Sequence, residues 1–209
     1  LVLGAVLNGG VTDDTTPTLS GTGAEANATI TVYNNGTAIG TTTADGAGAW
    51  SFTPSVALGA GAHSFTITAT DAAGNASAQS AAYVVTIDLS APAIPVIGSI
   101  TDNVGLVLGA VLNGGVTDDT TPTLSGTGAE ANATITVYNN GTAIGTTTAD
   151  GAGAWSFTPS AALGAGAHSF TISATDAAGN ASGQSAAYAI TIDVSAPAIP
   201  VIGSITDNV

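Results

Sequence analysis

Carboxylates are the only ionic side chains that this sequence offers for chemistry. Its 209 residues contain twelve Asp and two Glu but no Lys, Arg or Cys, and the formal net charge is −14. Because Ca²⁺ binds hard oxygen ligands, six to eight at a time, this composition favours calcium as a cofactor. Nucleic acids and anionic membrane surfaces are recognised largely through Lys and Arg, so we expect neither as a partner. No apolar run reaches 18 residues, so we expect no membrane insertion.

Every acidic side chain within residues 1–104 recurs one period later, because the chain is a tandem repeat. Residues 1–104 align on residues 106–209 at an offset of 105, and only six paired positions differ, all by small or apolar exchanges. An enzyme seldom needs two active sites in series, whereas a spacer gains length from each copy. The sequence therefore predicts an array whose neighbouring repeats are partners within one chain, each with its own core.

Three carboxylates are expected to meet where one repeat joins the next. Glu130 lies in the loop GAEAN and Asp176 begins the loop DAAGN, while Asp88 ends the last strand of the preceding repeat. In a sandwich of alternating strands these positions share one pole, so we expect them to hold an interdomain Ca²⁺. The alternative is three solvated loop acids. Matching half-sites, Glu25 with Asp71 and Asp193 alone, would be completed by a head-to-tail contact between two molecules.

A second acidic set is expected at the opposite pole. It consists of Asp102, Asn103, Asp118 and Asp119, with Asp13 and Asp14 as the counterparts in the first repeat. These residues could hold a second Ca²⁺ within the domain, or Asp-Asp-Thr-Thr-Pro could simply form the turn before a strand. Asp45 and Asp150 are interpreted as turn residues, and His63 and His168 as structural.

Short segments rich in Thr, Val, Ile and aromatic residues, broken by Gly, Asn, Asp and Pro, must position these acids. In the second repeat they predict strands at 95–101 (or the equivalent 200–206), 122–126, 133–138, 143–148, 155–158, 168–176 and 188–193. Asn140-Gly141 and Asn35-Gly36 are typical of tight hairpin turns. The pattern predicts an all-β fold of tandem immunoglobulin-like β-sandwiches, each with about seven antiparallel strands and no disulfide.

The register of the repeat suggests three segments. Residues 1–90 form a first repeat that lacks its own first strand, residues 91–195 a complete second repeat, and residues 196–209 the first strand of a following repeat. The last segment could complete the first repeat of another molecule by strand addition, in head-to-tail strings.

The succession TDDTTPTLSGTGAEANATITVYNNG, ADGAGAWSFTP, HSFTITATDAAGNAS and IDLSAPAIP resembles the bacterial immunoglobulin-like extender repeats of large RTX adhesins, which include biofilm and ice-binding adhesins. The resemblance implies type I secretion, an extracellular location at the bacterial cell surface and many tandem domains that project a ligand-binding tip. It also implies calcium at domain boundaries, and Asp88, Glu130 and Asp176 fall on the matching motifs. The family's Pro after the loop Glu is Ala131 here, a departure that affects the geometry of that loop.

These observations together predict a non-enzymatic structural extender of a cell-surface adhesin, rigidified by Ca²⁺ at its domain junctions, for adhesion or biofilm formation. The alternative is a carbohydrate- or protein-binding adhesive module. A glycosidase that uses paired carboxylates is the least favoured class, because the acids cluster at domain poles without a groove lined by aromatic residues.

Overall fold

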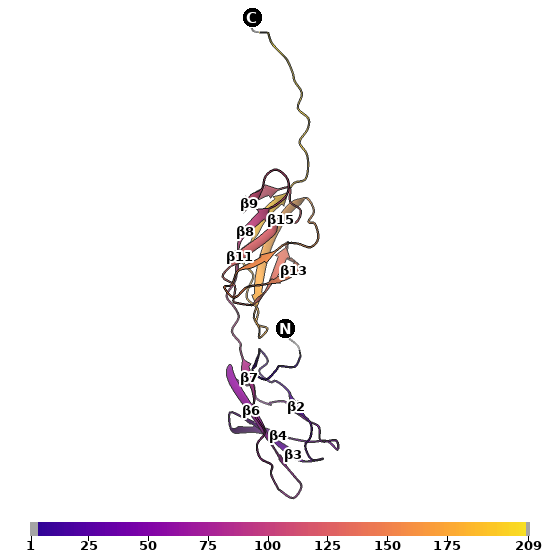
Figure 1. Ribbon diagram of the computed structural model, residues 1–209, viewed down its shortest axis with the longest axis vertical. Helices are drawn as coiled ribbons and strands as arrows, with labels where there is room; N and C mark the ends of the chain where they lie inside the picture. The colour runs from indigo at the N-terminus through magenta and orange to yellow at the C-terminus, as the bar shows by residue number, and fades with distance from the viewer. Residues whose placement is uncertain (1–3, 208–209) are drawn as a thin grey trace. The chain divides into compact units, whose positions relative to one another are not determined.

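The protein is built from β-strands alone in a computed structural model that describes residues 4–207. Its contacts divide it into two compact units (Figure 1). The first unit comprises Leu1–Ala93 with the loop Thr175–Ser182, and the second comprises Ile94–Ala174 with Gly183–Val209. Residues 1–3 of the first predicted segment and 208–209 of the third lie outside the described residues. Over residues 4–207 no helix is long and apolar enough to cross a membrane.

The strands of the first repeat form a five-stranded and a two-stranded sheet. The larger sheet has the order β1-β7-β6-β3-β4, and β2 pairs with β5 in the smaller one. The bounds are β1 Gly10–Thr12, β2 Leu19–Gly21, β3 Thr29–Asn34, β4 Thr37–Thr43, β5 Trp50–Phe52, β6 Gly61–Thr70 and β7 Tyr83–Ile87. The other edge of β2 pairs with no strand among the described residues.

The strands of the second repeat form a five-stranded and a four-stranded sheet. Their orders are β10-β16-β15-β12-β13 and β14-β11-β8-β9, and Figure 1 labels strands of both layers. The bounds are β8 Val96–Asp102, β9 Gly109–Val111, β10 Gly115–Thr117, β11 Thr123–Thr127, β12 Thr134–Asn139, β13 Thr142–Thr148, β14 Trp155–Phe157, β15 Gly166–Thr175 and β16 Tyr188–Ile192. The predicted all-β class of tandem immunoglobulin-like sandwiches is therefore confirmed.

Two short strands, β9 and β10, go beyond the strands predicted from the sequence, which placed residues 102–121 in one long connection. Each has three residues, too few for a period of two to stand out. β10 pairs with β16 in parallel, as β1 does with β7, so the expectation of wholly antiparallel sheets was wrong on this point. The parallel pairing arises because the chain passes from one sheet to the other between β9 and β10.

The predicted hairpin turns are confirmed. Asn35 and Gly36 have φ of 50° and 80°, and Asn140 and Gly141 have φ of 49° and 81°. Positive φ at both central residues is the geometry whose twist matches paired strands, and Asn-Gly adopts it at little cost.

The two cores differ although their sequences nearly coincide. In the second unit Leu124 and Ile172 are 0% exposed and Trp155 is 4% exposed, whereas Leu19, Ile67 and Trp50 at the matching positions are half-buried. The difference follows from β8, which lies along β11 and adds the fully buried Ile100 and the partly buried Ile97 to the second core.

Candidate functional site

Two buried carboxylates lie at one pole of the second unit. Asp102 is 5% exposed and Asp119 0% exposed. The Thr117 hydroxyl donates to Asp102 Oδ2 at 2.6 Å and accepts a hydrogen bond from the Asp119 amide at 3.0 Å. Asp119 accepts backbone hydrogen bonds from Asn103 at 3.2 Å and from Thr121 at 2.7 Å. This network satisfies both carboxylates, in a chain that has no Lys or Arg to pair with them.

The exposed Asp118 lies beside the same pole. Its carboxylate packs against the backbone of Gly105, which has φ of +72°, and a Cβ at that glycine would collide with the Asp118 oxygens. Both the left-handed backbone and the close approach require glycine here. The structure thus gathers the predicted residues Asp102, Asn103, Asp118 and Asp119 around one turn.

The counterparts in the first repeat have a different environment. Asp14, which matches Asp119, is exposed and accepts a hydrogen bond from the Thr16 amide at 2.8 Å. Asp13 is half-buried. Among residues 4–93 no strand takes the place that β8 has in the second unit. That strand and the residues after it are what bury Asp119.

Asp176 and Asp71 each close their own loop. Asp176 is 8% exposed and accepts hydrogen bonds from the Gly179 and Asn180 amides at 2.8 and 2.9 Å. Burial by itself raises the pKa of Asp176, but the hydrogen bonds from Asn180 and Gly179 outweigh it and lower that pKa. The side-chain amide of Asn75 is the main cause that lowers the pKa of Asp71. Each aspartate therefore has a structural role without any ion.

Asp88 and Asp193 end equivalent strands and also form local turns. Asp88 Oδ1 accepts from the Ser90 amide at 2.9 Å, and Asp193 Oδ1 accepts from the amide and the hydroxyl of Ser195. The hydroxyl of Ser195 is the main cause that lowers the pKa of Asp193. Within the first unit, the side-chain amide of Asn180 donates to the Asp88 carbonyl oxygen at 2.8 Å and to Asp176 Oδ2 at 2.9 Å.

Glu25 and Glu130 lie in matching turns with exposed side chains. The carbonyl oxygen of Glu25 accepts from the Ala28 amide at 3.0 Å, and that of Glu130 from the Ala133 amide at 3.1 Å. Glu25 and Asp71, predicted as a half-site, line the same groove of the first unit. Glu130 belongs to the second unit.

Any calcium site formed by these residues would contain fewer than three carboxylates. Within residues 4–207 no group of three or more His, Cys, Asp or Glu side chains is placed to hold a metal ion. A Ca²⁺ site here would need carbonyl, hydroxyl and water oxygens besides the carboxylates. Asp102, Asp119 and Thr117 fit best, because they offer hard oxygen atoms in a buried setting. The interdomain set of Asp88, Glu130 and Asp176 remains a prediction.

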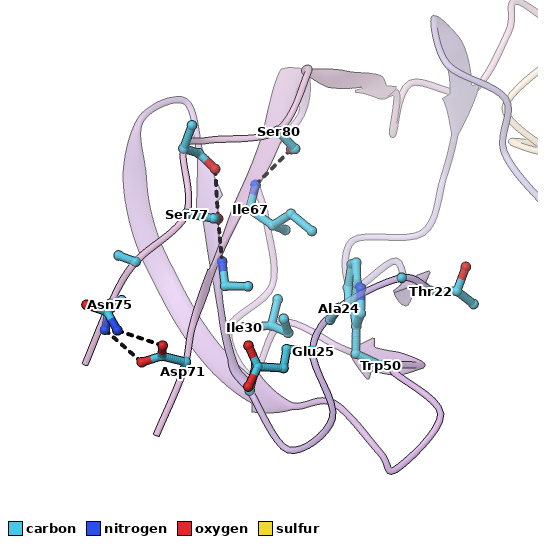
Figure 2. Close-up of a pocket in the computed structure, with 15 residues that line it drawn as sticks. Thr22, Ala24, Glu25, Ile30, Trp50, Ile67, Asp71, Asn75, Ser77 and Ser80 are labelled. Atoms are coloured by element: carbon cyan, nitrogen blue, oxygen red, sulfur yellow. Dashed lines mark hydrogen bonds between the residues drawn. The ribbon is translucent and has the colours of Figure 1, made fainter. Parts of the chain in front are cut away.

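The first unit also contains an open groove of about 480 Å³. Figure 2 shows Ile30 and Ile67 on its floor, with Trp50 on one side and the segment that carries Ser77 and Ser80 on the other. Sequence reasoning did not predict this groove. The signal that could have found it is that the strand predicted at 95–101 has no counterpart among residues 4–93, where no strand lies along the other edge of β2.

The two histidines have structural partners on both ring nitrogens. His168 Nε2 lies 2.8 Å from the Gly164 carbonyl oxygen, and Nδ1 lies 2.9 Å from the side-chain nitrogen of Asn139. Nε2 is therefore the protonated nitrogen and Nδ1 the acceptor. His63 repeats this arrangement with Gly59 and Asn34, which agrees with the structural interpretation.

The pKa values of four loop aspartates indicate that the stability of the fold decreases in acid. The pKa values of Asp71, Asp150, Asp176 and Asp193 are all lowered from 3.8. A depressed folded-state pKa contributes stability above the unfolded value, and that stability is lost as the pH falls through the folded pKa. We expect similar melting temperatures from pH 7 to about pH 5 and a decline below about pH 4.

Circular dichroism melts between pH 7 and pH 2 check this prediction. Replacing all four residues by Asn keeps an oxygen acceptor in each loop but removes the titrating charge. The quadruple variant should lose part of the acid-induced decline, and an unchanged decline would contradict these assignments.

Comparison with known proteins agrees with the fold. Residues 4–89 and 109–194 match the bacterial Ig-like domain family, and the chain belongs to that family. No curated protein sequence matches the chain.

Several solved structures are similar to the chain. The fibronectin(III)-like modules of Clostridium thermocellum CbhA share 16% identity over 87% of each chain, with a TM-score of 0.49. A tetra-tandem repeat in the extending region of a large adhesion protein shares 24% identity over 88% of this chain, with a TM-score of 0.36. A BSP domain of a biofilm-associated protein shares 22% identity over 89%, with a TM-score of 0.33. The chain covers 47% and 29% of the last two.

Proposed function

We propose that this chain is a pair of extender repeats from a bacterial cell-surface adhesin, in which each repeat adds length. The observation that carries the proposal is the near identity of two bacterial Ig-like domains in series, with only small or apolar exchanges between them. A spacer needs each copy to fold and to join the next, and nothing selects for different loops. Ig-like domains are a non-catalytic kind of domain, and the proposed role requires no active site.

Placement of the parent protein outside the cell, by type I secretion, belongs to the same proposal. It is supported by the resemblance of the motifs to RTX adhesin repeats. A binding module for carbohydrate is the competing function, and the folded chain on a glycan array at millimolar calcium distinguishes the two. Bound glycans would support the binding module and argue against a neutral spacer.

Calcium is proposed as the ion that stiffens the array. Support comes from the net charge of −14 without a single basic side chain, and from the buried carboxylates of Asp102 and Asp119. Self-repulsion opposes the compact state at such a charge, and bound cations relieve it. An affinity on the order of 10⁻⁴–10⁻³ M, typical of extracellular modules, would stabilise the fold by about 1.4 kcal/mol at ten times the dissociation constant.

Removal of calcium tests this role. We expect 5 mM CaCl₂ to raise the melting temperature by several degrees and to increase the maximum dimension in small-angle X-ray scattering relative to excess EGTA, because about 1 kcal/mol shifts a domain of this size by roughly 4–8 °C. Asp88→Ala should remove the scattering response, and Asp102→Asn with Asp119→Asn should reduce the thermal one.

Two controls separate binding from charge screening. NaCl of equal ionic strength should not reproduce the effect, and Asp45→Asn, at a turn aspartate that accepts from the Ala47 and Ala49 amides, should leave it intact. Identical scattering profiles and melting curves in calcium and EGTA would contradict the calcium proposal and leave the acids with a role in local turns only. The proposed spacer role does not depend on calcium and would not be affected.

A further inference from the structure

The loop 175–182 belongs by sequence to the second repeat, but its contacts place it in the first unit. It follows β15 and contains the motif DAAGN. Two hydrogen bonds connect it to residues that follow β1 and β7. The Asp13 amide donates to the Ala178 carbonyl oxygen at 3.2 Å, and the side-chain amide of Asn180 donates to the Asp88 carbonyl oxygen at 2.8 Å.

The ends of two parallel strands provide the groups that this loop contacts. β1 and β7 pair as far as Thr12 opposite Ile87, and the Asp88 amide donates to the Thr12 carbonyl oxygen at 2.9 Å. The pairing stops there, so the next donor and the next acceptor need partners from another segment. These are the Asp13 amide and the Asp88 carbonyl oxygen, and the loop supplies one acceptor and one donor for them.

The same motif in the first repeat shows which features of the loop depend on this contact. Asp71–Asn75 has the same sequence as Asp176–Asn180, and in each loop the Asn side chain donates to the Asp carboxylate. Figure 2 shows this bond in the first repeat. Ala73 is exposed, whereas Ala178 at the matching position is 1% exposed. Because the two loops are identical in sequence, residues outside the loop bury Ala178, and its hydrogen bond to Asp13 places the first repeat there.

We propose that the ends of β1 and β7 form a docking surface for the DAAGN loop of the following repeat, and that hydrogen bonds to backbone groups hold the loop there. The docking surface offers one amide and one carbonyl oxygen, so its side chains do not select the loop. It therefore accepts any repeat that carries the motif, as an array of near-identical copies requires. This inference rests on the proposed spacer role and adds to it the way in which one repeat recognises the next.

The carboxylates near the docking surface have other hydrogen-bond partners. Asp88 Oδ1 accepts from the Ser90 amide, and Asp176 Oδ1 accepts from the Gly179 amide. The two docking bonds join neutral groups, and each such bond contributes little to stability. The loop and its docking surface belong to one chain, however, so the effective concentration of the loop is high and weak bonds suffice. We therefore expect a contact that forms without calcium.

Hydrogen exchange of single amides, followed by NMR on the intact chain in excess EGTA, tests the docking. The Asp13 amide is the reporter because its acceptor lies in the loop, and the Asp88 amide is the reference because its acceptor lies in β1. Ala178→Glu should raise the exchange rate of the Asp13 amide on the order of 10-fold and leave that of Asp88 unchanged, because the buried methyl group leaves no room for a charged side chain. Ala73→Glu, at the exposed matching position, should change neither rate.

Asn180→Ala is a second variant, which removes one of the two docking bonds without adding bulk. It should raise the exchange rate of the Asp13 amide several-fold. Asn75→Ala is the matched control, because it loses the same bond to the aspartate of its own loop but no bond to Asp88. It should leave the ratio of the Asp13 and Asp88 rates unchanged.

Equal exchange of the Asp13 amide in the unmodified chain and in Ala178→Glu would overturn the proposal. A parallel rise at Asp13 and Asp88 would also overturn it, because the end of the first repeat would then be opening instead of releasing the loop. So would protection of Asp13 in calcium but not in EGTA, since an ion would then hold the loop. All three results leave the spacer role in place. Glycans bound on an array would overturn the spacer role instead and leave the exchange rate of Asp13 unchanged.

Discussion

On heating or in denaturant, the chain is expected to unfold in two steps, and the first repeat unfolds before the second. The two repeats differ at only six aligned positions, so sequence composition alone would predict a single step. Their cores differ in the presence of β8. The second core buries Ile100 completely and Trp155 to 4% exposure, while Trp50 in the first core is half-buried.

The expected difference in unfolding free energy is large. A fully buried Ile contributes about 1.5–3 kcal/mol. Adding Ile97 and the cover that β8 gives to Leu124, Trp155 and Ile172 brings the difference between the repeats to the order of 5 kcal/mol. For a domain of this size, 5 kcal/mol corresponds to roughly 20 °C in melting temperature.

Differential scanning calorimetry measures both steps, and hydrogen exchange with mass spectrometry assigns them to residues. The experiment should use a low protein concentration, so that no contact between molecules affects either transition. Ile100→Ala should then lower the second transition, by about 2–5 kcal/mol, and leave the first unchanged. A single transition, or earlier exchange in the second repeat, would contradict the assigned role of β8.

Asp119→Ala is expected to destabilise the second repeat by about 2–4 kcal/mol, while Asp14→Ala at the equivalent position costs less than about 1 kcal/mol. Asp119 is 0% exposed and accepts hydrogen bonds from the Asn103 and Thr121 amides. Removing its carboxylate leaves both amides without their acceptor at a partly buried place. Asp14 is exposed, and water replaces its bond to the Thr16 amide.

Urea unfolding of the two single variants measures this pair of effects, because each repeat reports on its own substitution. Asp119→Asn separates the hydrogen bonds from the charge, since an amide oxygen still accepts one of the two bonds. It should recover part of the loss. A gain in stability on Asp119→Ala would show that repulsion with Asp102 outweighs the hydrogen bonds, and equal effects at positions 119 and 14 would show that burial has no consequence.

Most of the fold could be predicted from local features of the sequence. The alternation in segments such as 133–138, the Asn140-Gly141 turn and the Asp-Gly loops act over a few residues, and the structure contains them in both repeats. The short strands β9 and β10 could not be predicted in this way. Each has three residues, and β10 becomes a strand because it pairs with β16, more than 70 residues further along the chain.

The sequence predicted which charged residues could form the candidate site, but it did not predict which of them are buried. The sequence showed which residues carry charge, that each acid has a counterpart 105 positions away, and that no basic side chain neutralises them. It placed Asp71 and Asp176 at loop starts, where the structure has them closing turns. Which carboxylates become buried depends on segments distant in sequence.

The tandem repeat, the all-β class, the hairpin turns and the acidic surface follow from the amino-acid sequence, because periodicity, turn residues and charge are local properties. Tertiary contacts determine which of two identical segments becomes a strand and which of two matching acids is buried. APAIPVIGSITD is largely a paired strand at 91–102 and an exposed segment at 196–207, while Asp119 is buried and Asp14 is exposed. A strand exists only when a free sheet edge accepts its backbone hydrogen bonds and its apolar side chains, and that edge is supplied by residues far along the chain.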